Sequence, residues 1–223
     1  MNSVKQECNF VETNNYNIMT RRIALLIIII STSISSVFSQ EKKENSKDKK
    51  YFIGSTFFML ANFDTNETPN YYQLNFGYRL TTKDVISIEA ITWDYYEPIG
   101  IPYGSEKADE KNNFPGKVES DGVGLSYKRF LWKGVYTQIH ATAFRQTYRD
   151  ENDKKIQNGF QLFNTLRFGY HFKLFKNRMF IEPSIAFTSW PINTNLPEAF
   201  QIEEDKWNRF FLFEPGLHFG INF

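Results

Sequence analysis

The stretch NRFFLFEPGLHFGINF, residues 208–223, decides the fold of this chain. Apolar side chains recur at every second position, at Phe211, Phe213, Pro215, Leu217, Phe219, Ile221 and Phe223. From Glu214 onward the residues between them are polar or small, namely Glu214, Gly216, His218, Gly220 and Asn222. Because successive side chains of a β-strand point to opposite faces, this pattern predicts a strand with one apolar and one polar face.

The same alternation recurs along the chain from Tyr51 onward, in segments separated by turn residues. The eight predicted strands are residues 51–63, 70–81, 84–96, 120–131, 134–148, 158–174, 178–190 and 208–223. The pattern is clearest in 158–174 and weakest in 51–63, where apolar residues fall on both faces. The chain is rich in aromatic residues, 17% of the total, yet its mean hydropathy is −0.46. That combination is typical of strands with alternating faces rather than of membrane helices.

The links between these segments differ in length in a regular way. Short links fall at residues 82–83, 132–133 and 175–177, and the long ones at 97–119 and 190–207. If the strands run alternately up and down, every short link lies at one end and every longer loop at the other. Small outer-membrane barrels sort their links in this manner. The sequence therefore predicts an all-β fold, an eight-stranded antiparallel up-and-down transmembrane β-barrel over residues 51–223.

The region before the strands is predicted to be an export signal and a tether. Arg21 and Arg22 precede an apolar run at residues 23–30, and small residues precede Gln40, so residues 1–39 are interpreted as an N-terminal extension and secretory signal peptide. The apolar run is shorter than the roughly 20 residues that a spanning helix needs. Residues 40–50 are charged and predicted to be a disordered tether. Either Met1 or Met19 is a possible start.

Charge and cysteine content exclude several function classes. The chain has 26 basic and 25 acidic residues and a net charge of +1, which gives no basic excess for binding nucleic acid. Its one cysteine, Cys8, lies before the leader, so the exported chain is expected to have no thiolate metal site. His140, His171 and His218 lie on three separate predicted strands, without the spacing of metal ligands. No metal and no cofactor are expected.

Residues 51–223 resemble the small bacterial outer-membrane β-barrel superfamily, which includes the membrane domain of outer membrane protein A. The resemblance rests on the alternation, the sorted links and the terminal Phe223. It implies a location in the bacterial outer membrane, with the membrane lipids as partners. It also implies that Leu217, Phe219, Ile221 and Phe223 form the signal that the barrel-assembly machinery recognises. Alternation alone leaves open a secreted soluble lipocalin-like binding barrel, whose apolar face would point inward.

The polar faces of the predicted strands carry charged residues that would meet inside a membrane barrel. These interior candidates are Arg79, Glu89, Lys128, Arg167, His171, Glu182 and Glu214. An eight-stranded barrel is just wide enough to hold side chains, so no open pore is expected. A two-residue turn at 176–177 predicts that His171 lies opposite Glu182 and that Phe172 lies opposite Ile181. Pro183 and Pro215 lack an N–H for the ladder, so a bulge or a local gap is expected at each.

A structural or surface-binding role is the function that the sequence favours. The loops 97–119 and 190–207 are long enough to bind an extracellular ligand, although they could equally be an inert cover. A lipid-modifying enzyme, an acyl hydrolase or transferase, is the alternative. Its weak candidates are His140 and Thr142, which share one face of a predicted strand and offer a hydroxyl beside a possible base. The spacing places no third catalytic partner.

Overall fold

The computed structural model describes residues 49–63, 68–107 and 109–223. The predicted signal peptide, and residues 40–48 of the tether, lie outside the described residues. The strands are β1 (Tyr51–Thr56), β2 (Tyr72–Arg79), β3 (Asp84–Tyr95), β4 (Lys117–Trp132), β5 (Val135–Arg149), β6 (Lys155–Tyr170), β7 (Phe172–Leu174), β8 (Met179–Thr194) and β9 (Phe210–Asn222). The helices are the 3₁₀-helices η1 (Phe57–Phe63) and η2 (Glu110–Asn112) and the α-helix α2 (Glu198–Glu204).

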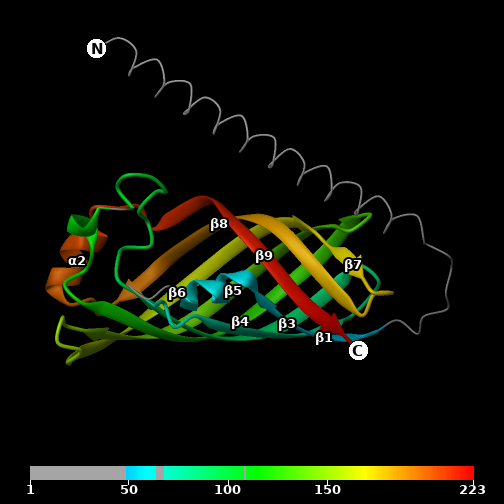
Figure 1. The fold of residues 1–223 in the computed structure, drawn as a ribbon, viewed down its shortest axis with the longest axis horizontal. Coiled ribbons are helices and arrows are strands. Elements are labelled where there is room, and N and C mark those ends of the chain that lie inside the picture. Colours follow the sequence, from blue (N-terminus) through cyan, green and yellow to red (C-terminus); the bar gives the residue numbers. More distant parts are fainter. Residues whose placement is uncertain (1–48, 64–67, 108) are drawn as a thin grey trace, which may run out of the picture. The chain divides into compact units, whose positions relative to one another are not determined.

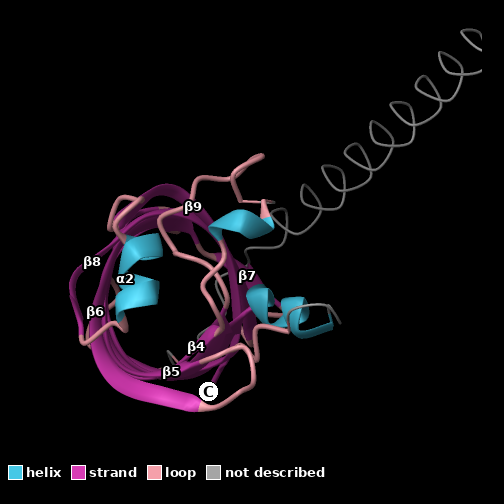
Figure 2. Ribbon diagram, turned by 90° about the vertical axis from the view of Figure 1, so that its left-hand side faces the viewer, coloured by secondary structure: helices cyan, strands magenta, loops and turns pink. Residues whose placement is uncertain are grey.

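The strands form one antiparallel sheet that closes on itself. Neighbours in the chain pair in sequence from β1 to β6, β1 also pairs with β9, and β9 pairs with β8. The ring closes where β8 pairs with β6 (Figures 1 and 2). The backbone N–H groups of Tyr51 and Phe223 each donate to the carbonyl of the other, so the last strand pairs with the first, as a barrel requires.

The described residues form nine strands rather than the predicted eight, because the segment 158–174 is divided at His171. Pro183 explains the division. The ladder between β8 and β6 ends at Ser184–Gly169 and resumes with β7 at Ile181–Phe172, so Pro183 faces the interruption. A proline has no N–H to donate to a neighbouring strand. The predicted register of Phe172 with Ile181 is confirmed.

The first predicted strand, 51–63, is only half correct, because β1 ends at Thr56 and residues 57–63 form η1. The Thr56 hydroxyl explains where the strand stops. It accepts a hydrogen bond from the backbone N–H of Phe58 and donates one to the carbonyl of Leu217. A side chain that bonds the local backbone in this way competes with the strand ladder.

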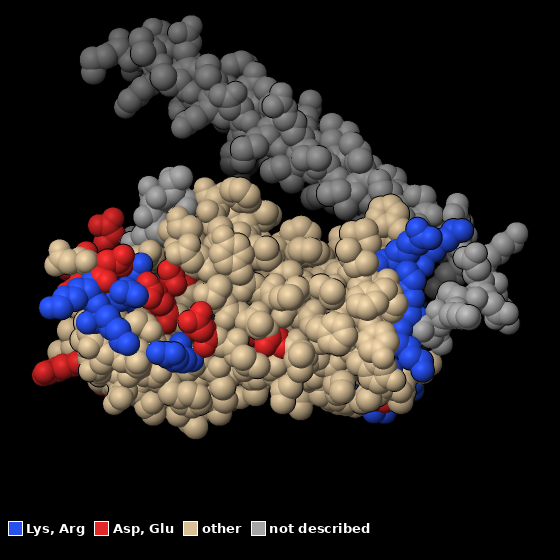
Figure 3. Space-filling model, turned by 90° about the horizontal axis from the view of Figure 1, so that it is seen from below, with Lys and Arg blue, Asp and Glu red and all other residues tan. Residues whose placement is uncertain are grey.

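The two faces of the barrel wall differ sharply in polarity. Large apolar side chains point outward, as Leu125 does with 65% of its surface exposed, whereas inward-pointing Glu89 is 4% exposed and Thr142 is 1% exposed. On the face seen in Figure 3 a broad band, interrupted by a single acidic patch, separates two charged ends. A soluble lipocalin-like barrel would have the opposite arrangement. In the described part of the chain no helix is both long and apolar enough to span a membrane.

The connections at one end of the barrel pack over its mouth. Helix α2 lies across this end of the ring of strands (Figure 2). Phe200 of α2 and Phe114 stack with their ring centroids 4.9 Å apart, and both belong to a buried cluster with Tyr95, Val118 and Tyr148. The loops predicted at 97–119 and 190–207 are shorter in the structure, because β4 already begins at Lys117 and β8 continues to Thr194. At the other end of the barrel, short turns join β2 to β3, β4 to β5 and β7 to β8.

A bulge in β9 changes the faces predicted for its first residues. The pairing of β8 with β9 shifts register between Ala186 and Thr188, and Phe213 there adopts a positive φ of 59°. The extra residue lets both Leu212 and Phe213 be exposed, and Phe211 lines the interior cavity. The prediction that Phe211 shares the outer face with Phe213 is wrong, because a β-bulge re-aims the side chains beyond it.

Candidate functional site

A buried ion pair occupies the lower half of the barrel, toward the short turns. Lys128 of β4 donates to both carboxylate oxygens of Glu182 of β8, at 2.7 and 2.5 Å. His171 Nδ1 lies 2.7 Å from Glu182 Oε1, as the predicted turn register requires. The ring of Phe180 contacts both His171 and Phe52, and Phe52, Val85 and Phe180 form a buried cluster below the ion pair. Polar and apolar side chains together fill this part of the interior.

The ring of Phe52 reaches into this cluster because Gly77 of the paired strand has no side chain. A Cβ atom built on Gly77 would lie 1.9 Å from the Phe52 ring. Glycine at this position therefore allows the two strands to pair with the aromatic ring between them.

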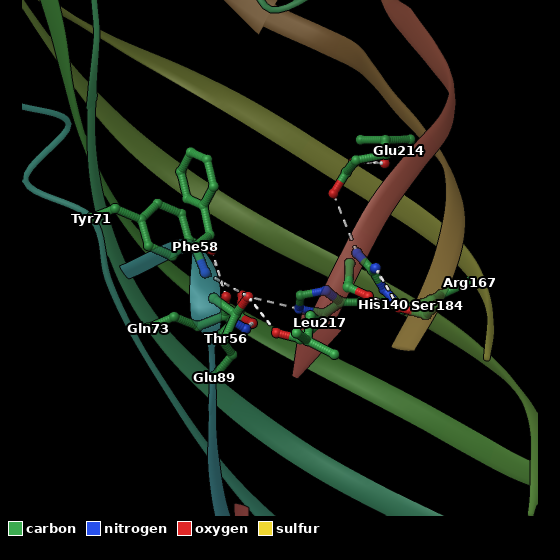
Figure 4. A network of polar contacts seen from close by, with 12 residues as sticks. Thr56, Phe58, Tyr71, Gln73, Glu89, His140, Arg167, Ser184, Glu214 and Leu217 are labelled. Atoms are coloured by element: carbon green, nitrogen blue, oxygen red, sulfur yellow. Dashed lines mark hydrogen bonds and ion pairs between the residues drawn. The ribbon is translucent and has the colours of Figure 1, made fainter. Parts of the chain in front are cut away.

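A second polar cluster lies in the upper half of the barrel, around Glu89 of β3 (Figure 4). Gln73 Nε2 donates to Glu89 Oε2 at 2.6 Å, and Thr142 donates to Glu89 Oε1 at 3.0 Å. His140 Nε2 lies 3.1 Å from the same Oε1 atom and 3.0 Å from the Thr142 hydroxyl. Tyr71 donates to Gln73 Oε1, which fixes the orientation of that amide. Strands β2, β3 and β5, together with the residue before β2, thus place their polar groups at one point.

The third group joins β6, β8 and β9. Arg167 Nη1 donates to the Ser184 hydroxyl at 3.0 Å, and its Nη2 lies 3.4 Å from Glu214 Oε1 (Figure 4). Thr188 donates to the other oxygen of Glu214. The guanidinium lies across Gly216, where an added Cβ would be 2.1 Å from Arg167 Nη1. Glycine at this position makes room for the arginine.

The two upper groups line a cavity of about 400 Å³ inside the barrel. This volume is within the usual range for small-molecule sites, roughly 300–1,000 Å³. Its walls combine the polar residues above with aromatic side chains, among them Phe52, Phe58, Trp93, Phe144, Phe163 and Phe211. His218 also lines the cavity, and its buried Nδ1 has no hydrogen-bond partner among the described residues. The cavity therefore offers both apolar surface and an unsatisfied polar atom.

The predicted interior residues separate into distinct groups. Lys128, His171 and Glu182 form the lower group, whereas Glu89 belongs to the second group and Arg167 and Glu214 to the third. All of these residues except His171 line the cavity. Arg79 donates instead to the Asn222 side chain, at 3.0 Å, near the short turns. Sequence reasoning missed the role of Gln73, Thr188 and His218, although all three occupy polar-face positions of the alternating pattern.

The structure places a carboxylate beside the two weak enzyme candidates, a partner that spacing did not reveal. A nucleophile–base–acid relay needs the hydroxyl at one imidazole nitrogen and the acid at the other. Here the Thr142 hydroxyl and Glu89 both contact Nε2 of His140. The Thr142 hydroxyl itself donates to Glu89. The geometry is that of a hydrogen-bond cluster and does not supply the relay.

A carboxylate is also buried in the cap, the name used here for α2 and the connections that lie over the mouth of the barrel. Glu204 of α2 accepts a hydrogen bond of 2.8 Å from the Trp190 indole and one of 3.3 Å from Asn193. Burial raises the pKa of Glu204 above its ordinary range, although these two donors and Arg209 lower it. Within the described ranges no group of three or more His, Cys, Asp and Glu residues is arranged to hold a metal ion.

Comparisons with known proteins add little to this description. No protein-family model matches the chain, and no curated protein matches it. Among solved structures, the crystal structure of Neisserial surface protein A is similar, with a TM-score of 0.42 and 9% sequence identity. The match covers 78% of this chain and 97% of that one.

Proposed function

We propose that this chain is a bacterial outer-membrane β-barrel that conducts no solutes and binds a ligand or surface partner. The observation that carries the proposal is the polarity of the wall, apolar outside and hydrogen-bonded and charged inside. If Leu125 and its neighbours faced water, the barrel would lose about 25 cal/mol of stabilising free energy for each Å² of apolar surface that lipid could cover. A lipid environment removes this cost, and the ring of paired strands satisfies most of the backbone groups within it.

The rim at the short turns supports the same placement. The turns at residues 80–83, 132–134 and 175–178 carry Lys83, Lys133, Lys176 and Arg178 and contain no Asp or Glu. Trp132 and Phe175 are exposed beside them. Figure 3 shows a band of Lys and Arg at one end of the barrel. Aromatic and basic side chains at one level suit the boundary between hydrocarbon and anionic headgroups, so outer-membrane lipids are the proposed partners of this rim.

The packing at both ends of the interior cavity supports the proposal that the barrel is not an open pore. The ion pair of Lys128 and Glu182 and the aromatic cluster below it occupy the short-turn half, and α2 with Phe114 packs over the mouth. The cap and the connections on either side of it are the surface proposed to meet an extracellular ligand. Leu217, Ile221 and Phe223 point outward along the last strand, which ends at the short turns, and the assembly machinery could contact them there before closure.

Cell fractionation tests the proposed function. A tagged full-length chain expressed in a Gram-negative host should be found in the outer-membrane fraction, resist extraction by carbonate, and migrate as a folded band that shifts on heating. Purified protein in a planar bilayer should give no sustained ionic current. A soluble protein in the periplasm or medium would contradict the membrane location, and steady open channels would contradict the closed interior.

A further inference from the structure

The barrel wall is incomplete in its upper half, between β2 and β9. The pairing of β1 with β9 ends at Thr56–His218, and its pairing with β2 ends at Gly54–Asn75. Within the described residues, Phe210 to Leu217 of β9 pair with β8 alone, and Tyr72 to Leu74 pair with β3 alone. Two strand edges therefore face each other with no strand between them.

Local features of β9 fit an edge that does not need a partner. Pro215 has no N–H to offer, and Gly216 beside it has no side chain to fill the space. The bulge with the positive φ of Phe213 lies immediately before them. Strain and bulges of this kind cluster at functional sites of barrels.

The helix η1 spans the space between these edges, and none of its residues is buried (Figure 1). It is bonded firmly to the β2 side, where Asn62 exchanges two hydrogen bonds of 2.8 Å with the backbone of Tyr71. On the β9 side the ring of Phe57, the first residue of the helix, lies 4.8 Å from the ring of Phe219. Among the described residues, the upper part of the β9 edge thus has no backbone partner on this side.

The interior cavity reaches the outer surface at this break. Its lining includes Phe58 and Pro69 from one side of the break and Pro215 and Gly216 from the other. Phe58 is 50% exposed, and Pro215 is also exposed, although both line an interior space. Among the described residues, the cavity is therefore exposed at the break in the wall as well as toward the mouth, where Tyr103 lines it and is 64% exposed.

We infer that this opening admits a long-chain fatty acid from the membrane into the cavity. The inference rests on the proposed function, because lipid must surround the wall. The aromatic walls suit a hydrocarbon chain, and the polar end of the ligand has a receptor beside the opening. Arg167 uses two of the five N–H groups of its guanidinium on Ser184 and Glu214, which leaves donors for a carboxylate. The unpartnered Nδ1 of His218 lies on the same cavity wall.

Photo-crosslinking tests the inference on the intact barrel in outer-membrane vesicles. A diazirine-bearing palmitate should label peptides that contain cavity-lining residues such as Trp93 and Phe144, and unlabelled palmitate should displace it. Hexadecanol should compete roughly tenfold less well, because it lacks the charge that Arg167 recognises. In Arg167→Gln this preference for palmitate should disappear. Labels confined to the outer face would overturn the inference, and so would equal competition by the two compounds.

Two pairs of substitutions separate the cavity from its opening. Thr165→Phe fills the cavity and should abolish internal labelling, whereas Ala143→Phe adds the same ring to the outer face and should not. Phe58→Lys places a charge in the opening and should reduce internal labelling, whereas Phe63→Lys on the same helix should not, since Phe63 is 82% exposed and does not line the cavity. Equal labelling of Thr165→Phe and Ala143→Phe would refute the cavity as the binding site. Equal labelling of Phe58→Lys and Phe63→Lys would refute the opening as its entrance.

The labelling of the wild-type barrel needs no substitution, so it tests the fatty-acid site even if a variant fails to fold. A barrel that folds in the outer membrane but takes no internal label would refute the fatty-acid site and leave the proposed function intact. A chain that never reaches the outer membrane would contradict both the fatty-acid site and the proposed function.

Discussion

His171 and Glu182 meet inside the barrel at the point where its wall is interrupted, with 2.7 Å between Nδ1 and Oε1. His171 is the residue that separates β6 from β7, and Pro183 follows Glu182 opposite the break. The side chains thus form a contact where the backbone ladder is missing. Lys128 completes the group from the far side of the interior.

The Lys128–Glu182 pair is expected to stabilise the barrel only while both partners are present. Removing one charge of a buried pair leaves the other uncompensated, which typically costs about 3–5 kcal/mol. Glu182→Leu should lower the free energy of unfolding by that amount, measured by urea titration in lipid vesicles. Adding Lys128→Met to it should recover most of the loss. A double variant no more stable than the single one would show that the pair is not the source of the stability.

Pro183 is expected to tolerate replacement, because its position faces an interruption of the ladder. Pro183→Ala should change the free energy of unfolding by less than about 1 kcal/mol. Val123→Pro is the comparison, since Val123 pairs with both Ala90 and Ala143 in continuous ladders. A proline in such a strand removes a ladder hydrogen bond and leaves a carbonyl without its donor, which should cost about 1–3 kcal/mol. Equal effects of the two changes would mean that the wall is not interrupted at Pro183.

The cap over the mouth should loosen as the pH rises. Burial raises the pKa of Glu204, so the folded cap binds a proton more tightly than the open one does. Its stability is therefore greatest below the ordinary pKa of a glutamate and falls as the pH rises through the raised value. Hydrogen exchange in α2 should accelerate over this pH range, beyond the intrinsic increase seen in an unstructured peptide. Glu204→Gln should remove this additional pH dependence of hydrogen exchange. If the pH profile of the variant were unchanged, the dependence would come from another group.

Deleting Phe223 should harm insertion more than stability. Its backbone exchanges two hydrogen bonds with Tyr51, and its ring lies 6.0 Å from that of Tyr51. Losing this exposed residue removes at most about 1.5–3 kcal/mol of apolar burial. The heat-modifiable fraction in outer membranes should fall severalfold, while the melting of refolded protein changes little. Normal insertion of the shortened chain would remove the terminal residues as an assembly signal.

Much of the fold follows from the period of two in the sequence. That period identifies the strand positions and the faces of residues such as Leu125 and Glu89, because the pleat alone determines where a side chain points. It cannot show where a strand stops or bulges. The hydroxyl of Thr56 and the bulge at Phe213 act through the backbone, and neither disturbs the polarity pattern enough to be recognised.

The candidate site was only partly predictable. One turn sufficed to bring His171 to Glu182, because the two residues belong to the same hairpin. Glu89, Thr142 and Arg167 lie on three strands, so their grouping depends on the stagger of the whole ring, which no single hairpin determines. The opening beside β9 also depends on which strand stops early, and Pro215 was the one sequence signal that pointed to it.

The free energy of unfolding of Leu125→Arg in lipid vesicles tests the membrane assignment most directly. Leu125 is 65% exposed in the middle of β4, and Ile202, 58% exposed in α2, is the matched control outside the wall. If lipid surrounds the wall, Leu125→Arg should cost about 2–4 kcal/mol and Ile202→Arg almost nothing. Water around the wall would make both changes nearly neutral, and that result would contradict the account.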